Sequence, residues 1–333
     1  MSKKFKAIVI DNQNDKFTRE VKELSTDTLK DGNVLVKIDY SSLNFKDALI
    51  LNNGGKIIRK YPFIPGIDFS GRVEESEDSK FKKNDKVILT GFRVGEMYFG
   101  GFSQYAKVNS DFLVKTPNDL NNLKVMKMGT AGLTALLCAF AVKAKEELLM
   151  GSKVKDVLVT GATGGVGSFA IMALSKMGYD VHAVTGKKEK HEYLKKLGAK
   201  NILDRNQFLG ESKLLEKGLW DCVVDTVGGE GLTKILAQTK PGGIVALPGN
   251  AGGNKISTNV MPFVIRGVKL WGIDSSSASA KRKEFVWNET SKLIDFSLID
   301  DFIKEVSLEE LLGVFPKILK GELSGRIVVN PNK

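Results

Sequence analysis

The chain has 333 residues, of which 42% are hydrophobic, and it carries a formal net charge of +11 at pH 7. This length is enough for two domains with buried cores. No apolar run is expected to approach the ~20 residues of a membrane span, and the start, Met-Ser-Lys-Lys-Phe-Lys, lacks the apolar stretch of a signal peptide. We therefore expect a cytoplasmic protein. The scattered lysines, with no basic stripe and no interleaved aromatic residues, argue against nucleic acid as the partner.

Histidine and cysteine are scarce. The two histidines, His182 and His191, lie in the second half of the chain, and residues 1–120 contain neither histidine nor cysteine. A catalytic zinc needs Cys, His or carboxylate ligands that converge on one point. We therefore expect no metal. Cys138 and Cys222 lie in apolar segments, so we expect both to be buried thiols. Free thiols fit a reducing cytoplasm.

The first part of the chain reads as β-rich. Short strand patterns alternate with turn signals, which predicts a barrel-like domain. The expected strands are 5–10, 34–43, 66–75, 86–90 and 103–108.

A different pattern begins near residue 123, with an apolar helix expected over 125–142. Strands then alternate with helices, which predicts a parallel, doubly wound sheet and an α/β class. The tail holds one expected helix, 308–319, and a strand that can return to the β-rich domain. We thus expect a catalytic domain of 1–122 and 291–333 and a nucleotide-binding domain of 123–290. The expected strands after residue 123 are 156–160, 180–184, 221–225, 243–247, 267–273 and 326–330.

A glycine-rich turn, Gly161-Ala-Thr-Gly-Gly-Val-Gly167, follows the first of these strands and opens a helical pattern. Such a turn lets the backbone approach a pyrophosphate at the helix N-terminus. We expect Gly164, Gly165 and Val166 to meet it. The alternative is a plain tight turn.

The end of the next strand indicates which dinucleotide is bound. NAD-binding domains usually carry an acid there, to hold the ribose 2′-hydroxyl. This chain instead has Thr185 and Lys187, with Lys190 close behind. These residues favour a 2′-phosphate and hence NADPH, although lysines also suit a solvated helix start. Further cofactor candidates, each with a structural alternative, are Thr130, Thr134, Arg205, Val227 and Asn250.

Several motifs together resemble the medium-chain dehydrogenase/reductase family, in its zinc-free quinone oxidoreductase branch and the YhdH/YhfP group. The resemblance covers essentially the whole chain. It implies a Rossmann domain, a GroES-like catalytic domain, NADPH as cofactor, and a cofactor contact from Arg326. Besides the glycine turn, the motifs are Asn44-Phe-Lys-Asp47, Pro65-Gly-Ile-Asp68, Thr90-Gly-Phe-Arg-Val-Gly-Glu-Met97, Gly100-Gly-Phe-Ser-Gln-Tyr-Ala106, Gly129-Thr-Ala-Gly132 and Trp271-Gly-Ile-Asp-Ser275.

The group includes acrylyl-CoA reductases, so the resemblance implies NADPH-dependent reduction of an enoyl-CoA double bond, with acrylyl-CoA the expected substrate. The alternative is an NADPH:quinone or general enone oxidoreductase. A non-enzymatic NADPH-binding protein and an RNA-binding protein are remoter alternatives. One departure is Ser276-Ser-Ala-Ser-Ala280, where the group usually has a bulky residue and a proline.

Reduction of an enoyl thioester needs donors at the developing enolate oxygen and a proton source at the α-carbon. We expect Asn44 to donate a hydrogen bond, Lys46 to supply charge or a proton, and Asp47 to orient Lys46. The same run also reads as an ordinary helix cap with a surface ion pair. Arg93 and Glu96, in a glycine-rich loop, are the expected substrate contacts, with a coenzyme A phosphate on Arg93. A solvated hairpin is the alternative.

The apolar segment around Trp271 is expected at the outer edge of the parallel sheet. An uncovered edge strand is a pairing hazard, and in this superfamily the edge usually pairs across a two-fold axis. We therefore expect a homodimer.

Overall fold

The structure, a computed structural model, describes residues 2–14, 16–148 and 153–333. They form two compact units. The β-rich unit comprises Met1–Thr130, Ser276–Asn288 and Ile299–Lys333, and the parallel-sheet unit comprises Ala131–Ser275 and Glu289–Leu298.

Two of the four unit boundaries fall inside helices, and the other two follow Ser275 and Leu298. The chain changes unit within α2 (Asn122–Leu148) and within α7 (Ala280–Leu293). The sequence placed the boundaries at 122/123 and 290/291, where the composition changes. A continuous helix offers no linker signal, so the sequence had nothing to mark the observed positions.

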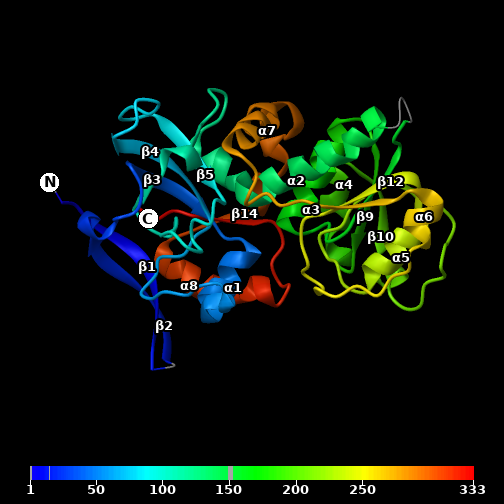
Figure 1. The fold of residues 1–333 in the computed structure, drawn as a ribbon, viewed down its shortest axis with the longest axis horizontal. Coiled ribbons are helices and arrows are strands. Elements are labelled where there is room, and N and C mark those ends of the chain that lie inside the picture. The colour runs from blue at the N-terminus through cyan, green and yellow to red at the C-terminus, as the bar shows by residue number, and fades with distance from the viewer. Residues whose placement is uncertain (1, 15, 149–152) are drawn as a thin grey trace. The chain divides into compact units, whose positions relative to one another are not determined.

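The β-rich unit contains a seven-stranded sheet and a two-stranded hairpin. The C-terminal strand pairs antiparallel with β3, with Val328 opposite Ser42, as expected of a returning tail strand. Helices α1 and α8 lie side by side (Figure 1) and share one apolar core with β1 and β15. The elements are β1 (Lys4–Gln13), β2 (Lys16–Ser25), β3 (Val34–Ser42), α1 (Phe45–Asn53), β4 (Asp68–Ser76), β5 (Lys86–Thr90), β6 (Tyr105–Val108), β7 (Val114–Lys115), β14 (Ile303–Val306), α8 (Leu308–Leu319) and β15 (Arg326–Val329).

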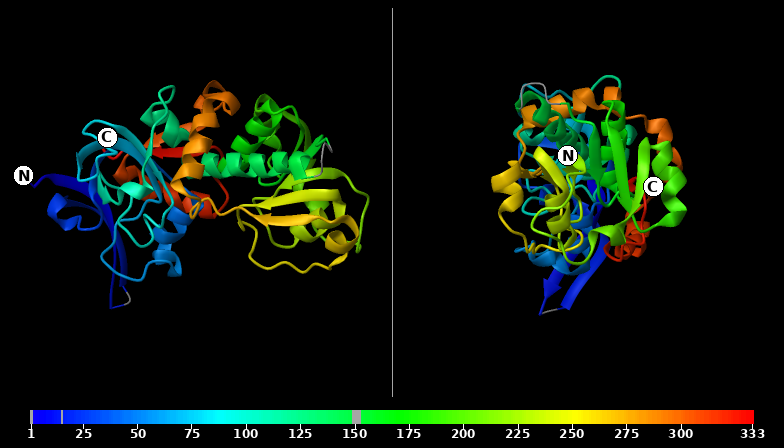
Figure 2. Two further views of the ribbon diagram at one scale, coloured as in Figure 1. Left: turned by 45° about the horizontal axis from the view of Figure 1, so that its top comes forward. Right: turned by 90° about the vertical axis from the view of Figure 1, so that its right-hand side faces the viewer.

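The parallel-sheet unit has six strands in the order β10-β9-β8-β11-β12-β13. All its strand pairs are parallel. This order is that of the doubly wound dinucleotide-binding fold, and its strands can be followed from green to yellow in Figures 1 and 2. The elements are β8 (Asp156–Val159), α3 (Gly165–Lys176), β9 (Asp180–Thr185), α4 (His191–Lys196), β10 (Ala199–Asp204), β11 (Trp220–Val224), α5 (Gly231–Gln238), β12 (Thr239–Leu247), α6 (Met261–Arg266) and β13 (Lys269–Gly272).

Within the described residues, four strands were not predicted from the sequence: β2, β7, β10 and β14. In β2 and β10 exposed and half-buried residues dominate, and β7 spans only Val114–Lys115. Hydrophobic periodicity, the main signal for strands, is weak in such segments. The strands that were predicted mostly have long buried runs.

Helix α2 corrects one expectation. It holds an 18-residue window of mean hydropathy 1.7, so by length and composition it could cross a membrane. The statement that no apolar run approaches a membrane span was therefore wrong. Of that window 83% is buried inside the protein, as in the core helix of a globular protein.

Candidate active site

The parallel-sheet unit holds a cavity of about 700 Å³ at the carboxyl ends of its strands. Thr160 follows β8, Thr185 ends β9 and Asp225 follows β11, and all three line the cavity. In doubly wound sheets ligands bind at this edge, where the strand order reverses. The volume lies within the range of ligand pockets.

The glycine turn lies beside this cavity. Gly161 has φ +57°, and a Cβ there would lie 2.1 Å from Thr226 Oγ1. A Cβ on Gly167 would lie 2.4 Å from the Gly161 carbonyl oxygen, so the helix start packs tightly on the turn. Gly164 is the N-cap of α3, and Gly165 begins the helix.

The lining of the cavity differs somewhat from the expected one. Gly161 and Thr163 of the glycine turn line it, although neither was named as a cofactor contact from the sequence. Gly164, Gly165 and Val166 instead form the cap and first turn of α3. Their position at a helix N-terminus still suits a phosphate group.

The tip of β9 is cationic. Lys187 and Arg205 line the cavity there, with Gly186 between Thr185 and Lys187. Burial lowers the pKa of Lys187, the charge of Glu189 opposes this, and the charges of Lys190 and Arg205 lower the pKa further. A bound phosphate would relieve this crowding of positive charge. Lys190 acts on Lys187 through charge and is not among the cavity-lining residues of the described chain.

Gly186 makes room for Arg205. A Cβ at Gly186 would lie 2.7 Å from Arg205 Nε. The guanidinium therefore lies directly against the turn that ends β9. Any other residue at position 186 would push it away.

A buried carboxyl, Asp225, braces the loop that follows β11. It accepts hydrogen bonds from the Thr160 hydroxyl and from the backbone N–H groups of Val227 (3.2 Å) and Gly228 (3.0 Å). Burial raises its pKa, and these donors oppose the rise. Val227 was predicted from the sequence and Asp225 was not, although an acid directly after an apolar strand was a signal for it.

The β-rich unit contains a second constellation, a buried polar cluster. At its centre the carboxylate of Asp68 accepts from Ser42 N (3.0 Å), Asn44 Nδ2 (2.9 Å) and Thr130 N (2.8 Å). Asp68 is completely buried. With its oxygens engaged in these contacts, Asp68 braces the cluster.

Arg326 lies in the same cluster. Its Nη2 donates to Ser42 Oγ (2.7 Å), and its Nη1 donates to Leu43 O (3.1 Å) and Asn44 Oδ1 (3.2 Å). Burial lowers the pKa of Arg326, whereas the charges of Asp68 and Asp47 raise it. Arg326 is therefore a buried member of this cluster and not a surface group.

Gly129 allows the cluster to close. It interrupts α2 with φ +53°, and a Cβ there would lie 2.5 Å from Ser42 Oγ and 2.8 Å from Arg326 Nη2. The kink brings the Thr130 N–H to Asp68. This gives the Gly129-Thr-Ala-Gly132 motif a physical reason.

Asp47 faces inward. Its oxygens accept from Ile67 N (2.9 Å) and Asn44 N (2.9 Å), the latter as half of a capping box at the start of α1. Burial, with the nearby charge of Asp68, raises its pKa to about 8. With Asp47 protonated, the charges of Asp68 and Arg326 balance. The capping box confirms the helix-cap interpretation of the run Asn44-Phe-Lys-Asp47.

Lys46 points elsewhere. Its ammonium pairs with Glu96 at 2.8 Å, and its side chain is 39% exposed whereas that of Glu96 is 10% exposed. The expectation that Asp47 orients Lys46 was wrong, because successive residues of a helix face different ways. Arg93 is exposed and belongs to the same loop as Glu96.

Three further expected cofactor residues also lie away from the described cavity lining. Thr130 belongs to the cluster around Asp68, Thr134 Oγ1 donates to Ser275 Oγ (2.7 Å), and Asn250 lies in the exposed loop after β12. Among the described residues no three His, Cys, Asp or Glu side chains converge as a metal site would require.

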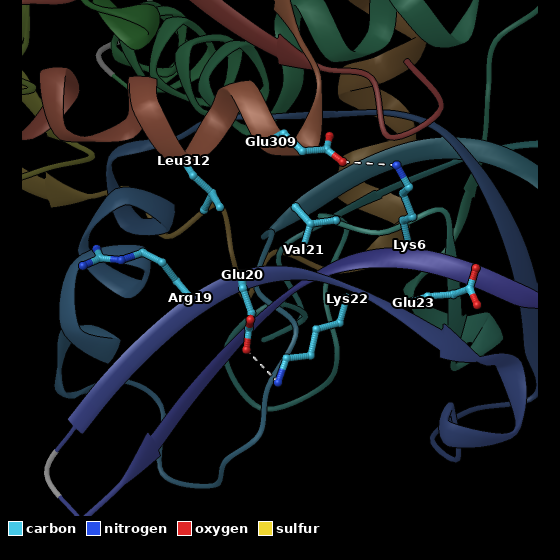
Figure 3. Close-up of a pocket in the computed structure, with 8 residues that line it drawn as sticks. All are labelled: Lys6, Arg19, Glu20, Val21, Lys22, Glu23, Glu309 and Leu312. Carbon is cyan, nitrogen blue, oxygen red and sulfur yellow. Dashed lines mark hydrogen bonds and ion pairs between the residues drawn. The ribbon is translucent and has the colours of Figure 1, made fainter.

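A second cavity, of about 480 Å³, lies in the β-rich unit between β2 and α8. Figure 3 shows Lys6 bridged to Glu309 (3.2 Å) and Lys22 to Glu20 (2.8 Å). Because charges of both signs pair with each other there, we assign no ligand to it.

The pKa of Asp47 leads to a prediction about stability. A carboxyl whose pKa is raised on folding stabilises the folded state at low pH, and this contribution is lost as pH rises from about 4 to about 8. The unfolding free energy should fall by up to about 1.4 kcal/mol per pH unit in this window. Asp47→Asn should flatten this dependence of the unfolding free energy on pH, measured by calorimetric melts at several pH values. The exposed control Asp31→Asn should keep it, and an equally steep D47N profile would contradict the assignment.

Comparison with known proteins identifies the family of the chain. Residues 30–118 match the model of the alcohol dehydrogenase GroES-like domain, and residues 165–296 match that of the zinc-binding dehydrogenase. The chain is 43% identical over 326 residues to the probable acrylyl-CoA reductase AcuI of Escherichia coli, covering 98% of this chain and 99% of that protein.

Two further relatives are similar over nearly their whole length. The putative quinone oxidoreductase YhfP of Bacillus subtilis is 41% identical, with 99% of each chain covered, and its structure with NAD bound has a TM-score of 0.92. The E. coli YhdH structure with bound NADPH also has a TM-score of 0.92 at 42% identity, covering 98% of this chain and 100% of that one. The chain is therefore an oxidoreductase that belongs to the medium-chain dehydrogenase/reductase family.

Proposed function

We propose that this oxidoreductase uses NADPH to reduce the carbon–carbon double bond of an enoyl-CoA, with acrylyl-CoA as substrate and propionyl-CoA as product. The observation that carries the proposal is the cationic tip of β9, at Lys187 and Arg205, on a cavity of ligand size. The substrate comes from the name of the relative that is 43% identical over 98% of this chain.

The residues of the parallel-sheet unit suit NADPH. The Gly161 turn and the start of α3 offer close backbone approach and free N–H groups to a pyrophosphate. Thr185, Lys187 and Arg205 would hold the 2′-phosphate, which NAD lacks. When bound, NADPH supplies the hydride.

The β-rich unit would supply the polar groups for the reaction. As the hydride arrives at the β-carbon, negative charge grows on the thioester oxygen. The Lys46 ammonium would neutralise this charge or give a proton to the α-carbon. Asn44 and Asp47 have their polar groups engaged within the cluster, so we assign them the role of fixing the start of α1, which carries Lys46.

The loop with Arg93 and Glu96 would meet the substrate. Arg93 is exposed and its guanidinium suits a coenzyme A phosphate. Glu96 orients Lys46 through their 2.8 Å pair, in place of the role first expected of Asp47. A second candidate function is quinone reduction, favoured by the relative YhfP, which is named a putative quinone oxidoreductase and is 41% identical.

Homodimer formation remains a prediction, as does the cytoplasmic location. Strand β13 is the outer strand of the parallel sheet, and Trp271 on it is 38% exposed. Val264 and Ile265 of the neighbouring helix α6 are more exposed still. Light scattering should give twice the 36.4 kDa chain mass at micromolar concentration. A monomer would contradict pairing through this edge.

Initial rates of NADPH oxidation test the proposed function. With acrylyl-CoA we expect kcat/KM of ~10⁴ M⁻¹s⁻¹ or more, and a far lower value with NADH. Benzoquinone run in parallel tests the second candidate. Turnover with benzoquinone and none with acrylyl-CoA would replace the first proposal by the second and remove the role of Arg93.

A further inference from the structure

The loop between β5 and β6 begins in an uncommon backbone conformation. Gly91, Phe92 and Arg93 follow one another with φ of +74°, +54° and +62°. Residues other than glycine rarely adopt positive φ, bulky ones least of all. Such geometry persists only where the surroundings impose it. Something must therefore hold Phe92 and Arg93 in place.

The segment after β13 supplies part of that hold. The Ser276 carbonyl accepts from Phe92 N at 3.0 Å. A Cβ on Gly91 would lie 2.6 Å from the same oxygen, so the two backbones are in direct contact. The serine-rich segment thus acts on the loop through a main-chain carbonyl.

Lys283 of α7 supplies a further part, beside Phe112, whose ring stacks on that of Phe92 at 5.0 Å between centroids. Its ammonium donates to Thr90 O (2.5 Å) and to Ser276 O (3.1 Å), and it lies 3.4 Å from the centre of the Phe92 ring. The side chain is 1% exposed. One buried cation therefore contacts Thr90 at the end of β5, Ser276 of the serine-rich segment and the ring of Phe92.

Burying an ammonium is costly, and an apolar side chain of similar length would fill the same space without that cost. What an apolar side chain cannot do is bind two carbonyl oxygens and the face of an aromatic ring at once. The charge of Lys283 is thus explained by the geometry that it imposes on the loop.

The far end of the loop reaches the proposed chemistry. Glu96 N and Met97 N both donate to Arg93 O, at 3.1 and 2.8 Å, so a tight turn links the strained residues to Glu96. Glu96 in turn binds Lys46 at 2.8 Å. Displacement of Phe92 or Arg93 would be passed on to this ion pair.

We propose that Lys283 is a positioning residue of the reductase: it holds the 91–98 loop in its strained conformation and thereby sets Glu96 against Lys46. The proposal rests on the proposed function, which gives Lys46 its role. Lys283 itself acts through the loop.

The test compares Lys283→Met, Lys283→Arg and the exposed control Lys281→Met. Hydrogen exchange of the amides in 91–98 should become faster in K283M, with the rest of the unit unchanged. A small misplacement can cost about 100-fold in rate, so kcat should fall about 10- to 100-fold while KM for NADPH stays within about twofold. K283R should recover part of the loss, and K281M should behave as the unchanged protein.

Lys46→Met separates the two ways to fail. If K46M is impaired while K283M keeps its hydrogen exchange or its kcat, the inference about Lys283 is overturned and the proposed function stands. Full turnover by K46M would overturn the role of Lys46 and with it the catalytic part of the inference. If the activity of K283M fell only by the fraction of the protein that is unfolded, this would also overturn the inference about Lys283.

Discussion

Replacing Arg326 by methionine is expected to destabilise the β-rich unit by about 3–5 kcal/mol, the usual cost of leaving one partner of a buried ion pair alone. Arg326 is buried and donates to Ser42, Leu43 and Asn44, while its charge balances that of Asp68. Differential scanning calorimetry at pH 7 measures the effect as a lower Tm for this unit.

Two variants control for this prediction. Arg282→Met removes an exposed arginine of α7 and should leave the Tm nearly unchanged. Adding Asp68→Asn to R326M should recover part of the lost stability, because it removes the carboxylate that lost its partner. If R326M has the same Tm as R282M, this charge balance does not stabilise the cluster.

Arg205→Ala is expected to weaken NADPH binding about 10- to 100-fold and to leave NADH binding unchanged. Hydrogen bonds to charged groups contribute about 1.5–3 kcal/mol, and each 1.4 kcal/mol is a factor of ten in Kd. Arg205 lines the cavity and lies against Gly186 at the tip of β9. Isothermal titration of both nucleotides measures the change in selectivity.

Lys195→Ala is the matched control, since Lys195 is an exposed cation of the same unit paired with Glu192. It should leave both affinities as they are. An equal loss for NADPH and NADH in R205A would show that Arg205 supports the fold or the adenosine and does not bind the 2′-phosphate. Gly186→Val, which pushes Arg205 aside, should reproduce the loss of selectivity.

The sequence predicted the fold because its signals were local. Buried strands such as β8 and β11 show as apolar runs, and the Gly161 turn and the capping box at Asn44 are short motifs with a fixed spacing. Each depends on neighbours along the chain.

The arrangement of the candidate site depends on distant residues. Arg326 meets Ser42 across most of the chain, and Glu96 reaches Lys46 from another loop. Nothing in the run Asn44-Phe-Lys-Asp47 shows that Asp47 turns inward while Lys46 stays partly exposed. The sequence analysis therefore paired Lys46 with Asp47, whereas the structure pairs it with Glu96.

Lys283 shows the same limit more strongly. It lies in a charged helical stretch, where lysine is normally a surface residue. Its burial follows from contacts with Thr90 and Ser276, which no local pattern reveals. Charged residues that are buried by distant partners are those that sequence patterns miss.

The position of deuterium in the product tests the central claim most directly. NADPH carrying deuterium at both C4 positions is incubated with acrylyl-CoA, and the product is analysed by mass spectrometry. The account predicts propionyl-CoA with one deuterium at C3, the former β-carbon. Oxidation of the coenzyme with no labelled propionyl-CoA, or label at C2, would contradict it.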